Sequence, residues 1–459
     1  MSSENTAAPQ TPKPSSSGGA LDRYFNITER GSTISTEIRG GLATFFAMSY
    51  IVVLNPLILG LTPDSSGRSL GVPQVAAMTA LVAGVMTILL GVYAKPPFAM
   101  AAGLGVNALL ATTIATTPNL TWPQIMGLVV WAGVLMTALV LTGFRTAVFD
   151  AVPESLKTAI VVGIGLFIAF VGLVNAGIIR RAETGSTPVV FGVHGHLLGW
   201  PTLVFIVGVF LTLILYGSVQ ANPLGWSLNV PTWDGSGFGL PDFSLLFSAD
   251  LFGAFSSLGA MASILLVFTI LISAFFDVMG SIMGMAVEAG SIDENGKIKD
   301  IDRLLLVDAL GAVAGGGTST STNQVFVESA TGIGAGARTG LANVVTGALF
   351  LGAIFLSPLV TIVPFEAVAP AMVFVGFLMV RQAVNVDWND LALGISAFLT
   401  IVIMPLSYSI AHGIGAGFIS YTVIRVATGR GREVHWLMYV VSAVFAVHFG
   451  MGLIEGWMR

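Results

Sequence analysis

The chain has 459 residues, of which 54% are hydrophobic and only 9% are charged, and its mean hydropathy is +0.88. Soluble globular proteins carry about 25% charged residues, so this composition excludes a soluble globule. The absence of cysteine excludes disulfides and thiolate chemistry, and a net charge of -5 with scattered basic residues excludes a nucleic-acid partner.

Apolar runs that can cross a bilayer follow one another along almost the whole chain. A helix needs about 20 residues to cross a hydrocarbon layer of about 30 Å, because it rises ~1.5 Å per residue. The runs cover residues 37–60, 74–94, 98–117, 121–145, 153–177, 200–218, 257–287, 302–316, 322–337, 340–363, 366–381, 391–406, 408–426 and 436–456. The sequence therefore predicts an all-α, multi-pass protein of the cell membrane.

Two of these runs, 98–117 and 322–337, are short and rich in glycine and hydroxyl residues, so they are expected to be broken spans. Residues 98–105 resemble residues 326–334, about 228 positions later, which indicates a duplicated unit about half the chain long. Paired interrupted spans are typical of carriers that hold a ligand near the middle of the bilayer. The pattern favours a transporter over an enzyme.

Three acidic residues lie inside predicted spans, where ionisable groups are costly and usually functional. Asp277 lies within LISAFFDVMGSIMG, with Ser281 on the same helix face, and could instead cap a broken helix. Glu328 is expected where a short strand feeds a half-helix, with a helix cap or an ion pair with Arg338 as the alternatives. Asp308 is expected either to make structural hydrogen bonds or to handle protons.

The first broken span has no acid but contains Asn107, whose amide offers both donors and an acceptor. A hydrogen bond between helices is the alternative role for this residue. Half-helix glycines that allow close backbone approach are expected at Gly103, Gly105, Gly332 and Gly334. No phosphate-loop motif or metal-ligand spacing accompanies them, so we expect no cofactor and no ATP coupling, and transport driven by an ion gradient.

The acids Asp277 and Glu328, the amide of Asn107 and the ring of Phe326 together suit a small, flat, polar solute with several N–H donors, such as a nucleobase. Burial disfavours the charged form of a carboxyl group, so one of the acids can carry a proton during transport. The proton-coupling candidates are Asp277, Glu328 and Asp308.

Several stretches of the sequence resemble the AzgA-like purine permeases of the nucleobase:cation symporter-2 family, which includes xanthine and uracil permeases. The matching stretches include GGLATFFAMSYIVVLNPLIL, AAGLGVNALLA, FDVMGSIMG, VESATGIGAGARTGLANVVTG and MPLSYSIAHGIGAGFISY, within residues 22–435. The resemblance implies proton-coupled uptake of adenine, guanine or hypoxanthine. It implies substrate-binding roles for Asp277, Glu328 and Asn107, and weaker ones for Ser281, Phe326 and Ala47.

The resemblance also implies a seven-plus-seven inverted repeat with a core and a gate domain. The expected domain boundaries are a disordered cytoplasmic tail (1–36), first-half core (37–145), incomplete first-half gate (146–218), polar connection (219–256), second-half core (257–363), second-half gate (364–435) and C-terminal hydrophobic segment (436–459). The last segment either crosses the bilayer or lies along its surface. A homodimer is compatible with the sequence.

The chain departs from the family pattern after its sixth apolar run, because residues 219–256 contain no Lys, no Arg and no adequate apolar run. Short cytoplasmic loops carry an excess of Lys and Arg. Only seven crossings before the 257–287 run would place Lys297, Lys299 and Arg303 on the same side as Lys95 and Arg145. An inverted repeat also needs an odd number of spans per half. We therefore predict that the seventh span has been lost.

Three other functions remain as alternatives to purine uptake. A transporter of the same fold for uracil, xanthine or an anion such as sulfate is the first, although an anion site should not present two acids. A channel is the second, but the asymmetric acids do not form the ring of like residues that pores use. An enzyme is the least favoured, because no nucleophile and base pair appears.

Overall fold

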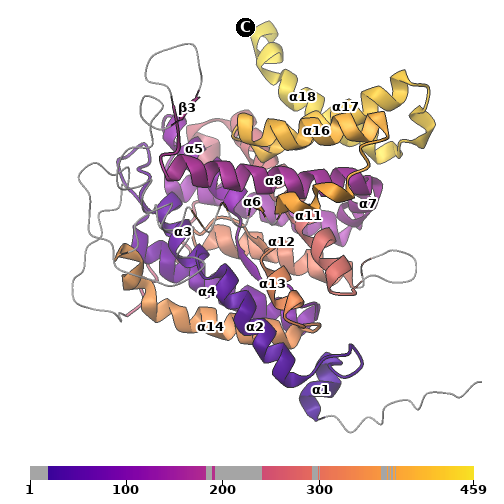
Figure 1. Cartoon of the computed structure of the whole chain (residues 1–459). Coiled ribbons are helices and arrows are strands. Elements are labelled where there is room, and N and C mark those ends of the chain that lie inside the picture. Colours follow the sequence, from indigo (N-terminus) through magenta and orange to yellow (C-terminus); the bar gives the residue numbers. More distant parts are fainter. Residues whose placement is uncertain are drawn as a thin grey trace, which may run out of the picture.

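The computed structural model describes residues 19–181, 189–191, 240–291, 298, 300–362, 370, 373, 376–377 and 379–458. Long helices run side by side across the molecule, from the left to the right of Figure 1. Among the described residues, six helices are long and apolar enough to cross a membrane. Shorter apolar helices include α16 (Leu391–Leu406) and the first half of α18 (Trp436–Met458), and whether α18 crosses the membrane or lies along its surface stays open.

The elements follow the predicted runs closely. Those of the first half are α1 (Ala20–Phe25), α2 (Ile34–Met48), α3 (Ile51–Leu59), α4 (Val72–Tyr93), β1 (Met100–Ala102), α5 (Leu104–Thr116), α6 (Trp122–Leu141), α7 (Phe144–Ala151), α8 (Glu154–Asn175), β2 (Ile179–Arg181) and β3 (Val189–Phe191). Those of the second half are α10 (Gly253–Ser257), α11 (Ala260–Glu288), α12 (Ile301–Gly317), β4 (Asn323–Val325), α13 (Ser329–Gly334), α14 (Gly340–Ala353), η1 (Ile354–Ile362), η2 (Arg381–Asn385), α16, α17 (Ile410–Ala427), η3 (Gly431–Glu433) and α18.

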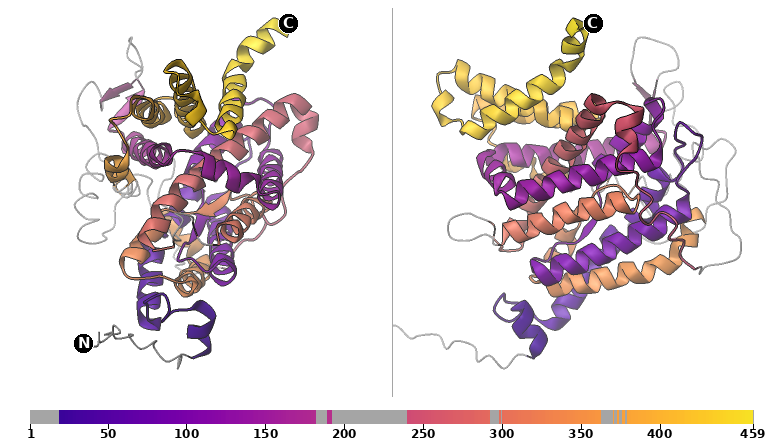
Figure 2. Two further views of the ribbon diagram at one scale, coloured as in Figure 1. Left: turned by 90° about the vertical axis from the view of Figure 1, so that its right-hand side faces the viewer. Right: turned by 180° about the vertical axis from the view of Figure 1, so that it is seen from behind.

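The helices pack by small residues and by cross-contacts between the halves. Helix α14 packs against α4 and α2, α12 packs against α6, and α16 packs against α8 and α17. Figure 2 shows α16, α17 and α18 gathered at one edge of the bundle, away from α14 and α2. The halves are thus intertwined instead of standing as separate units.

Both broken spans have the expected form, a three-residue strand followed by a helix. Strands β1 and β4 pair antiparallel, with Met100 opposite Val325 and Ala102 opposite Asn323. Antiparallel strands are what an inverted repeat requires at its centre. In the structure, Gly103 precedes α5 and Glu328 precedes α13, so these two residues occupy matching positions. The number of residues that separates the two repeats is therefore smaller than expected, by about one helical turn.

The N-terminal region differs from the expected disordered tail over residues 19–36. Phe25, the last residue of α1, and Ile27, in the turn that follows, are buried against Leu341 of α14. The Arg30 guanidinium donates to the carbonyl oxygens of Lys95 and Arg338, at 3.2 and 3.3 Å. These contacts fix residues 19–36 against the ends of both broken spans, although composition alone predicted solvation.

Residues 240–258 lie at the same end of the bundle as the 60–71 loop. The Gln74 amide donates to Asp242 at 2.9 Å, and the backbone N–H of Asp250 donates to the carbonyl of Pro123 at 2.8 Å. Helix α11 therefore runs from this end to the opposite one, as the charge distribution predicted. The sixth span, at 200–218, and most of the polar connection lie outside the described residues, so the lost seventh span stays a prediction.

Candidate functional site

Asp277 lies in the middle of α11, buried, with 6% of its surface exposed. The side-chain amide of Gln324, from β4, donates a hydrogen bond to Asp277 Oδ2. A side chain at Gly105 of α5 would lie 3.7 Å from the same carboxyl oxygen. Asp277 therefore faces both broken spans, and a neutral amide is its hydrogen-bond donor.

Glu328 is the residue before α13, yet its side chain makes no helix-capping hydrogen bond. Instead, the hydroxyl of Tyr50, between α2 and α3, donates to Glu328 Oε1 at 2.5 Å. The other carboxyl oxygen, Oε2, is buried without a protein partner, and Arg338 donates to the carbonyls of Ile333 and Ala337. Neither of the structural alternatives for Glu328 accounts for its carboxyl group.

The two acids share one region of the bundle. Helix α11, which carries Asp277, packs against α13, which Glu328 immediately precedes. The ring of Phe326, two residues before Glu328, lies 6.4 Å from the ring of Tyr50. The structure thus places the two acids that the sequence singled out on contacting elements, with an aromatic pair beside Glu328.

Asn107 is fully buried in α5 and takes part in a chain of polar side chains. Its amide donates to Asn55 Oδ1 at 2.7 Å, and the Asn55 amide donates to Thr79 Oγ1 at 2.7 Å and to the carbonyl of Thr320 at 3.3 Å. The alternative role of Asn107, a hydrogen bond between helices, is therefore present. Its Oδ1 nevertheless remains a buried acceptor without a protein donor.

Asp308 is the acid with the most complete set of partners. Its Oδ2 pairs with the guanidinium of Arg145 at 2.7 Å, and its Oδ1 accepts the backbone N–H of Val325 at 3.1 Å. Arg145 was expected as a charge in a cytoplasmic loop, but it is 1% exposed. The electrostatic environment of Asp308 is thus that of a structural ion pair.

Ser281, Ala47 and Gly103 are further residues that the sequence predicted for the site. Ser281 donates to the carbonyl of Asp277 at 3.2 Å, as a serine one turn along a helix does, and Ala47 is half-buried in α2. A Cβ atom at Gly103 would lie 2.6 Å from the side chain of Gln324. The close approach expected for Gly103 is therefore present.

Two further glycines, both in α13, differ in their surroundings. A Cβ atom at Gly332 would overlap Thr44 Oγ1 and lie 2.5 Å from the carbonyl oxygen of Gly40. At Gly334 the nearest atom would be Glu288 Oε1, at 3.6 Å, which is an ordinary contact. Only Gly332 is required by the packing of α13 against α2.

Tyr50 and Gln324 are site residues that the sequence reasoning missed. Both are polar side chains within or beside apolar runs, so the rule that singled out the acids could also have found them. Arg145 was missed because it lies next to the polar end of a predicted span, where a loop charge is the usual interpretation.

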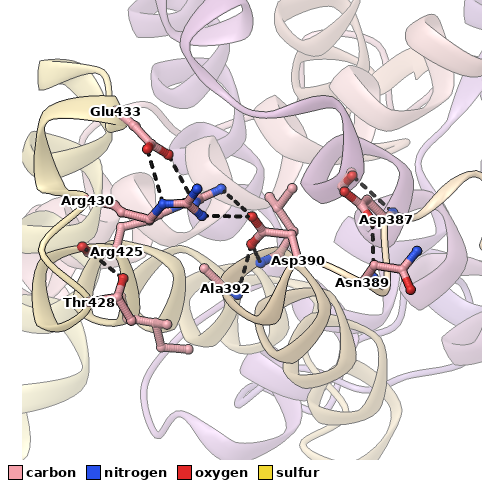
Figure 3. A network of polar contacts seen from close by, with 11 residues as sticks. Asp387, Asn389, Asp390, Ala392, Arg425, Thr428, Arg430 and Glu433 are labelled. Atoms are coloured by element: carbon pink, nitrogen blue, oxygen red, sulfur yellow. Dashed lines mark hydrogen bonds and ion pairs between the residues drawn. The ribbon is translucent and has the colours of Figure 1, made fainter.

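A separate polar network joins α16 to α17 and η3, away from these acids (Figure 3). Asp390 accepts the backbone N–H groups of Leu393 and Ala392, and Arg425 pairs with both Asp390 and Glu433, at 3.0 and 3.1 Å. The N–H of Leu393 is the largest cause that holds the pKa of Asp390 below its usual range. The network fixes helix ends and leaves the membrane-embedded acids as the candidate site.

Two solved structures share this architecture. The transmembrane domain of a cyanobacterium bicarbonate transporter, BicA, aligns with a TM-score of 0.51 at 15% identity, covering 83% of this chain and 96% of that one. The murine Slc26a9 anion transporter in its inward-facing state aligns with a TM-score of 0.50 at 12% identity, covering 92% and 74%. At this identity the likeness shows the fold alone, which is the seven-plus-seven inverted repeat with two broken spans.

Curated sequences are much closer relatives. The chain is 36% identical to the adenine permease AdeQ of Escherichia coli over 443 residues, which cover 94% of this chain and 97% of that protein. It is 37% identical to the guanine/hypoxanthine permease PbuG of Bacillus subtilis, with 94% and 99% covered. The family model for xanthine and uracil permeases, described as Permease family, matches residues 35–416. The chain therefore belongs to this family of multi-pass membrane permeases.

Proposed function

We propose that the protein takes up purine nucleobases by proton symport, with Asp277 and Glu328 as its principal substrate-binding residues. The observation that carries the proposal is the arrangement of these two buried acids, each bonded to a neutral donor, Gln324 or Tyr50, instead of a cation. The relatives named for adenine and for guanine and hypoxanthine transport support the choice of a purine.

The hydrogen-bond acceptors that have no protein donor suit a planar base with several N–H groups. Glu328 Oε2 and Asn107 Oδ1 are buried acceptors without protein donors, and such groups cost free energy until a donor reaches them. Adenine, guanine and hypoxanthine each present N–H donors along their edges. Phe326 and Tyr50 offer aromatic faces on which a flat ring can stack.

Proton coupling follows from the same two acids. A carboxyl group without a cationic partner is most easily accommodated in a membrane interior when it binds a proton. Asp277 and Glu328 lie on elements that contact each other, α11 and the start of α13, so either carboxyl group can hold a proton in the same part of the bundle. A bound proton can then enter and leave together with the base.

Competition uptake tests the proposal directly. Cells expressing the chain are given radiolabelled adenine or hypoxanthine, with guanine, uracil, xanthine and sulfate as competitors. We expect saturable uptake that purines compete for, and that a protonophore abolishes. Competition by uracil or sulfate, but not by purines, would instead indicate another solute on the same fold. A flux that does not saturate would indicate a channel.

The proposal extends to the domains and to assembly. The predicted core domain (37–145 and 257–363) contains the two broken spans, and the predicted gate domain (146–218 and 364–435) would move against it. A homodimer remains part of the proposal, and the mass of the purified protein in detergent tests it.

A further inference from the structure

We propose that Arg145 and Asp308 are positioning residues for substrate binding, which hold β4 in register and thereby set the contact between Gln324 and Asp277. This inference rests on the proposed function. Asp308 then has a structural role instead of proton coupling. Arg145 lies on α7, which contributes no other residue to the site.

Each of the two central strands has an outer edge that does not face the other strand. Strands β1 and β4 satisfy each other along one edge, so the backbone groups on the outer edges need other partners. On β1, Thr87 of α4 accepts the N–H of Met100 at 2.9 Å and donates to its carbonyl at 3.1 Å. On β4, Asp308 of α12 accepts the N–H of Val325 at 3.1 Å.

Met100 and Val325 are direct partners in the two-stranded sheet. At these matching positions, both halves of the molecule use a side chain from a neighbouring helix to accept a hydrogen bond from the outer edge of the strand. The first half uses a hydroxyl group, which is neutral. The second half uses a carboxylate, whose charge must be compensated in the membrane interior.

Arg145 supplies this compensation and is fixed at three points. Its guanidinium pairs with Asp308 at 2.7 Å, donates to the carbonyl of Leu305 at 3.1 Å and lies 5.3 Å from the centre of the Phe275 ring. Both charged side chains are 2% exposed. Arg145 thus contacts α12, which holds β4, and also α11, two residues from Asp277.

The pair acts on the site through one residue of β4. Val325, which Asp308 holds, follows Gln324, whose side-chain amide donates to Asp277. Side chains alternate between the faces of a strand, so a shift at Val325 moves the Gln324 amide relative to α11. Loss of the ion pair should therefore weaken purine binding without removing any group that touches the base.

The test measures purine uptake by wild type, Arg145→Met, Asp308→Asn, the double variant and Arg145→Lys, with membrane levels determined in parallel. Each single neutral variant leaves a buried charge unpaired, so we expect the KM to rise about tenfold. Membrane levels are used to normalise the maximal rate. The double variant keeps an acceptor for Val325 and no charge, so its KM should return to within about threefold of wild type. Arg145→Lys keeps the charge and should fold, with a smaller rise in KM.

A matched control lies between the same two helices. The hydroxyl of Thr146 on α7 donates to Asp302 on α12 at 2.7 Å, in an exposed position that does not contact β4. Thr146→Ala and Asp302→Asn should leave the KM unchanged. The double variant Arg145→Met with Asp308→Asn should also keep the dependence of uptake on the proton gradient.

Three outcomes would overturn the inference. An unchanged KM in both Arg145 variants would show that the pair does not position the site. A double variant that reaches the membrane but transports without proton dependence, or not at all, would make Asp308 a proton carrier. Failure of wild type to take up any purine would overturn the proposed function as well, which distinguishes the two failures.

Discussion

The first broken span, β1 with α5, is surrounded by neutral groups, whereas the second, β4 with α13, is surrounded by carboxyl groups. Asn107 and Thr87 make the polar contacts of the first. Around the second, Asp308 takes the place of Thr87 at the strand edge and Glu328 precedes α13 as Gly103 precedes α5, while Asp277 faces both. The backbone of the two halves is alike, but the chemistry is not.

This difference explains how a duplicated fold can bind an asymmetric solute. Two identical half-sites related by an inverted repeat would present the same groups from both sides. In the proposed site, a neutral side with an amide and an acidic side with two carboxyl groups would instead distinguish the edges of a base and keep the protonable groups together. Substitutions that erase this difference should damage transport most.

The largest effect is expected when the acidic side is made neutral. Asp277→Asn and Glu328→Gln each remove a charged acceptor from the site, and hydrogen bonds to charged groups contribute about 1.5–3 kcal/mol. We expect uptake to fall by about 100-fold while the protein still reaches the membrane. Glu288→Gln, at the exposed end of the same helix α11, is the matched control. Normal uptake by either site variant would remove that residue from the site.

A smaller effect is expected on the packing of the second broken span. Gly332→Ala would push a methyl group into Thr44 and the Gly40 carbonyl, and overpacking of this kind costs about 1–3 kcal/mol. We expect lower thermal stability in detergent and less uptake. Gly334→Ala, two residues along α13, meets only an ordinary contact and should behave as wild type. Equal behaviour of both variants would contradict the packing described for α13.

On the neutral side, Asn107→Ala should raise the KM by about tenfold with little change in abundance, because one hydrogen bond and one free acceptor are lost. Asn343 is the contrasting amide. It donates to the carbonyls of Pro96 and Phe98 just before β1, at 3.0 and 2.6 Å. Asn343→Ala should therefore lower stability instead of affinity. If Asn107→Ala fails to accumulate while transport per molecule is normal, Asn107 is structural too.

The smallest effect concerns a carboxyl group outside the membrane. Burial raises the pKa of Asp64, but hydrogen bonds from Ser66, Arg68 and Trp122 outweigh it, so the pKa is lowered in the folded protein. A lowered pKa stabilises the fold above the unfolded value of about 3.9, and this stability is lost as the pH falls through the folded value. Asp64→Asn should therefore have a Tm a few degrees lower at pH 7, with the difference vanishing once the pH lies below the folded pKa of Asp64. A constant difference would exclude this linkage.

The sequence predicted the helices well because runs of apolar residues are a direct requirement of the bilayer. It predicted the acids Asp277 and Glu328 for the same reason, since an ionisable group in such a run is rare. It could not predict Tyr50 or Gln324 as their partners, because these contacts join residues 278 and 47 positions apart. It also placed Arg145 in a loop, because only the fold reveals Asp308 opposite it.

The sequence predicted that the two halves are related by a repeat, but it aligned their residues incorrectly. Matching glycines suggested one alignment of residues 98–105 with 326–334, whereas the strands and helix starts fix another. Glycine-rich stretches look alike at several offsets, so side-chain identity is a weak guide there. Burial of Phe25 and Ile27 was missed because these two residues are too few to create an apolar run.

The parity of the crossings that precede α11 can be tested without activity, because the chain contains no cysteine. Single cysteines at Ser65 and Arg303 can be labelled with a membrane-impermeant thiol reagent from one side at a time. We expect the two positions to lie on opposite faces of the membrane. Labelling from the same side would contradict both the charge argument and the direction of α11.

The central claim, that two buried acids bind a purine together with a proton, is tested most directly in proteoliposomes. Purified protein is reconstituted, an inward proton gradient is imposed, and accumulation of radiolabelled adenine or hypoxanthine is followed with and without a protonophore. We predict accumulation above equilibrium that collapses when the gradient is dissipated and that is absent in Asp277→Asn and Glu328→Gln. Purine accumulation that persists in both variants, or uptake that ignores the gradient, would contradict the account.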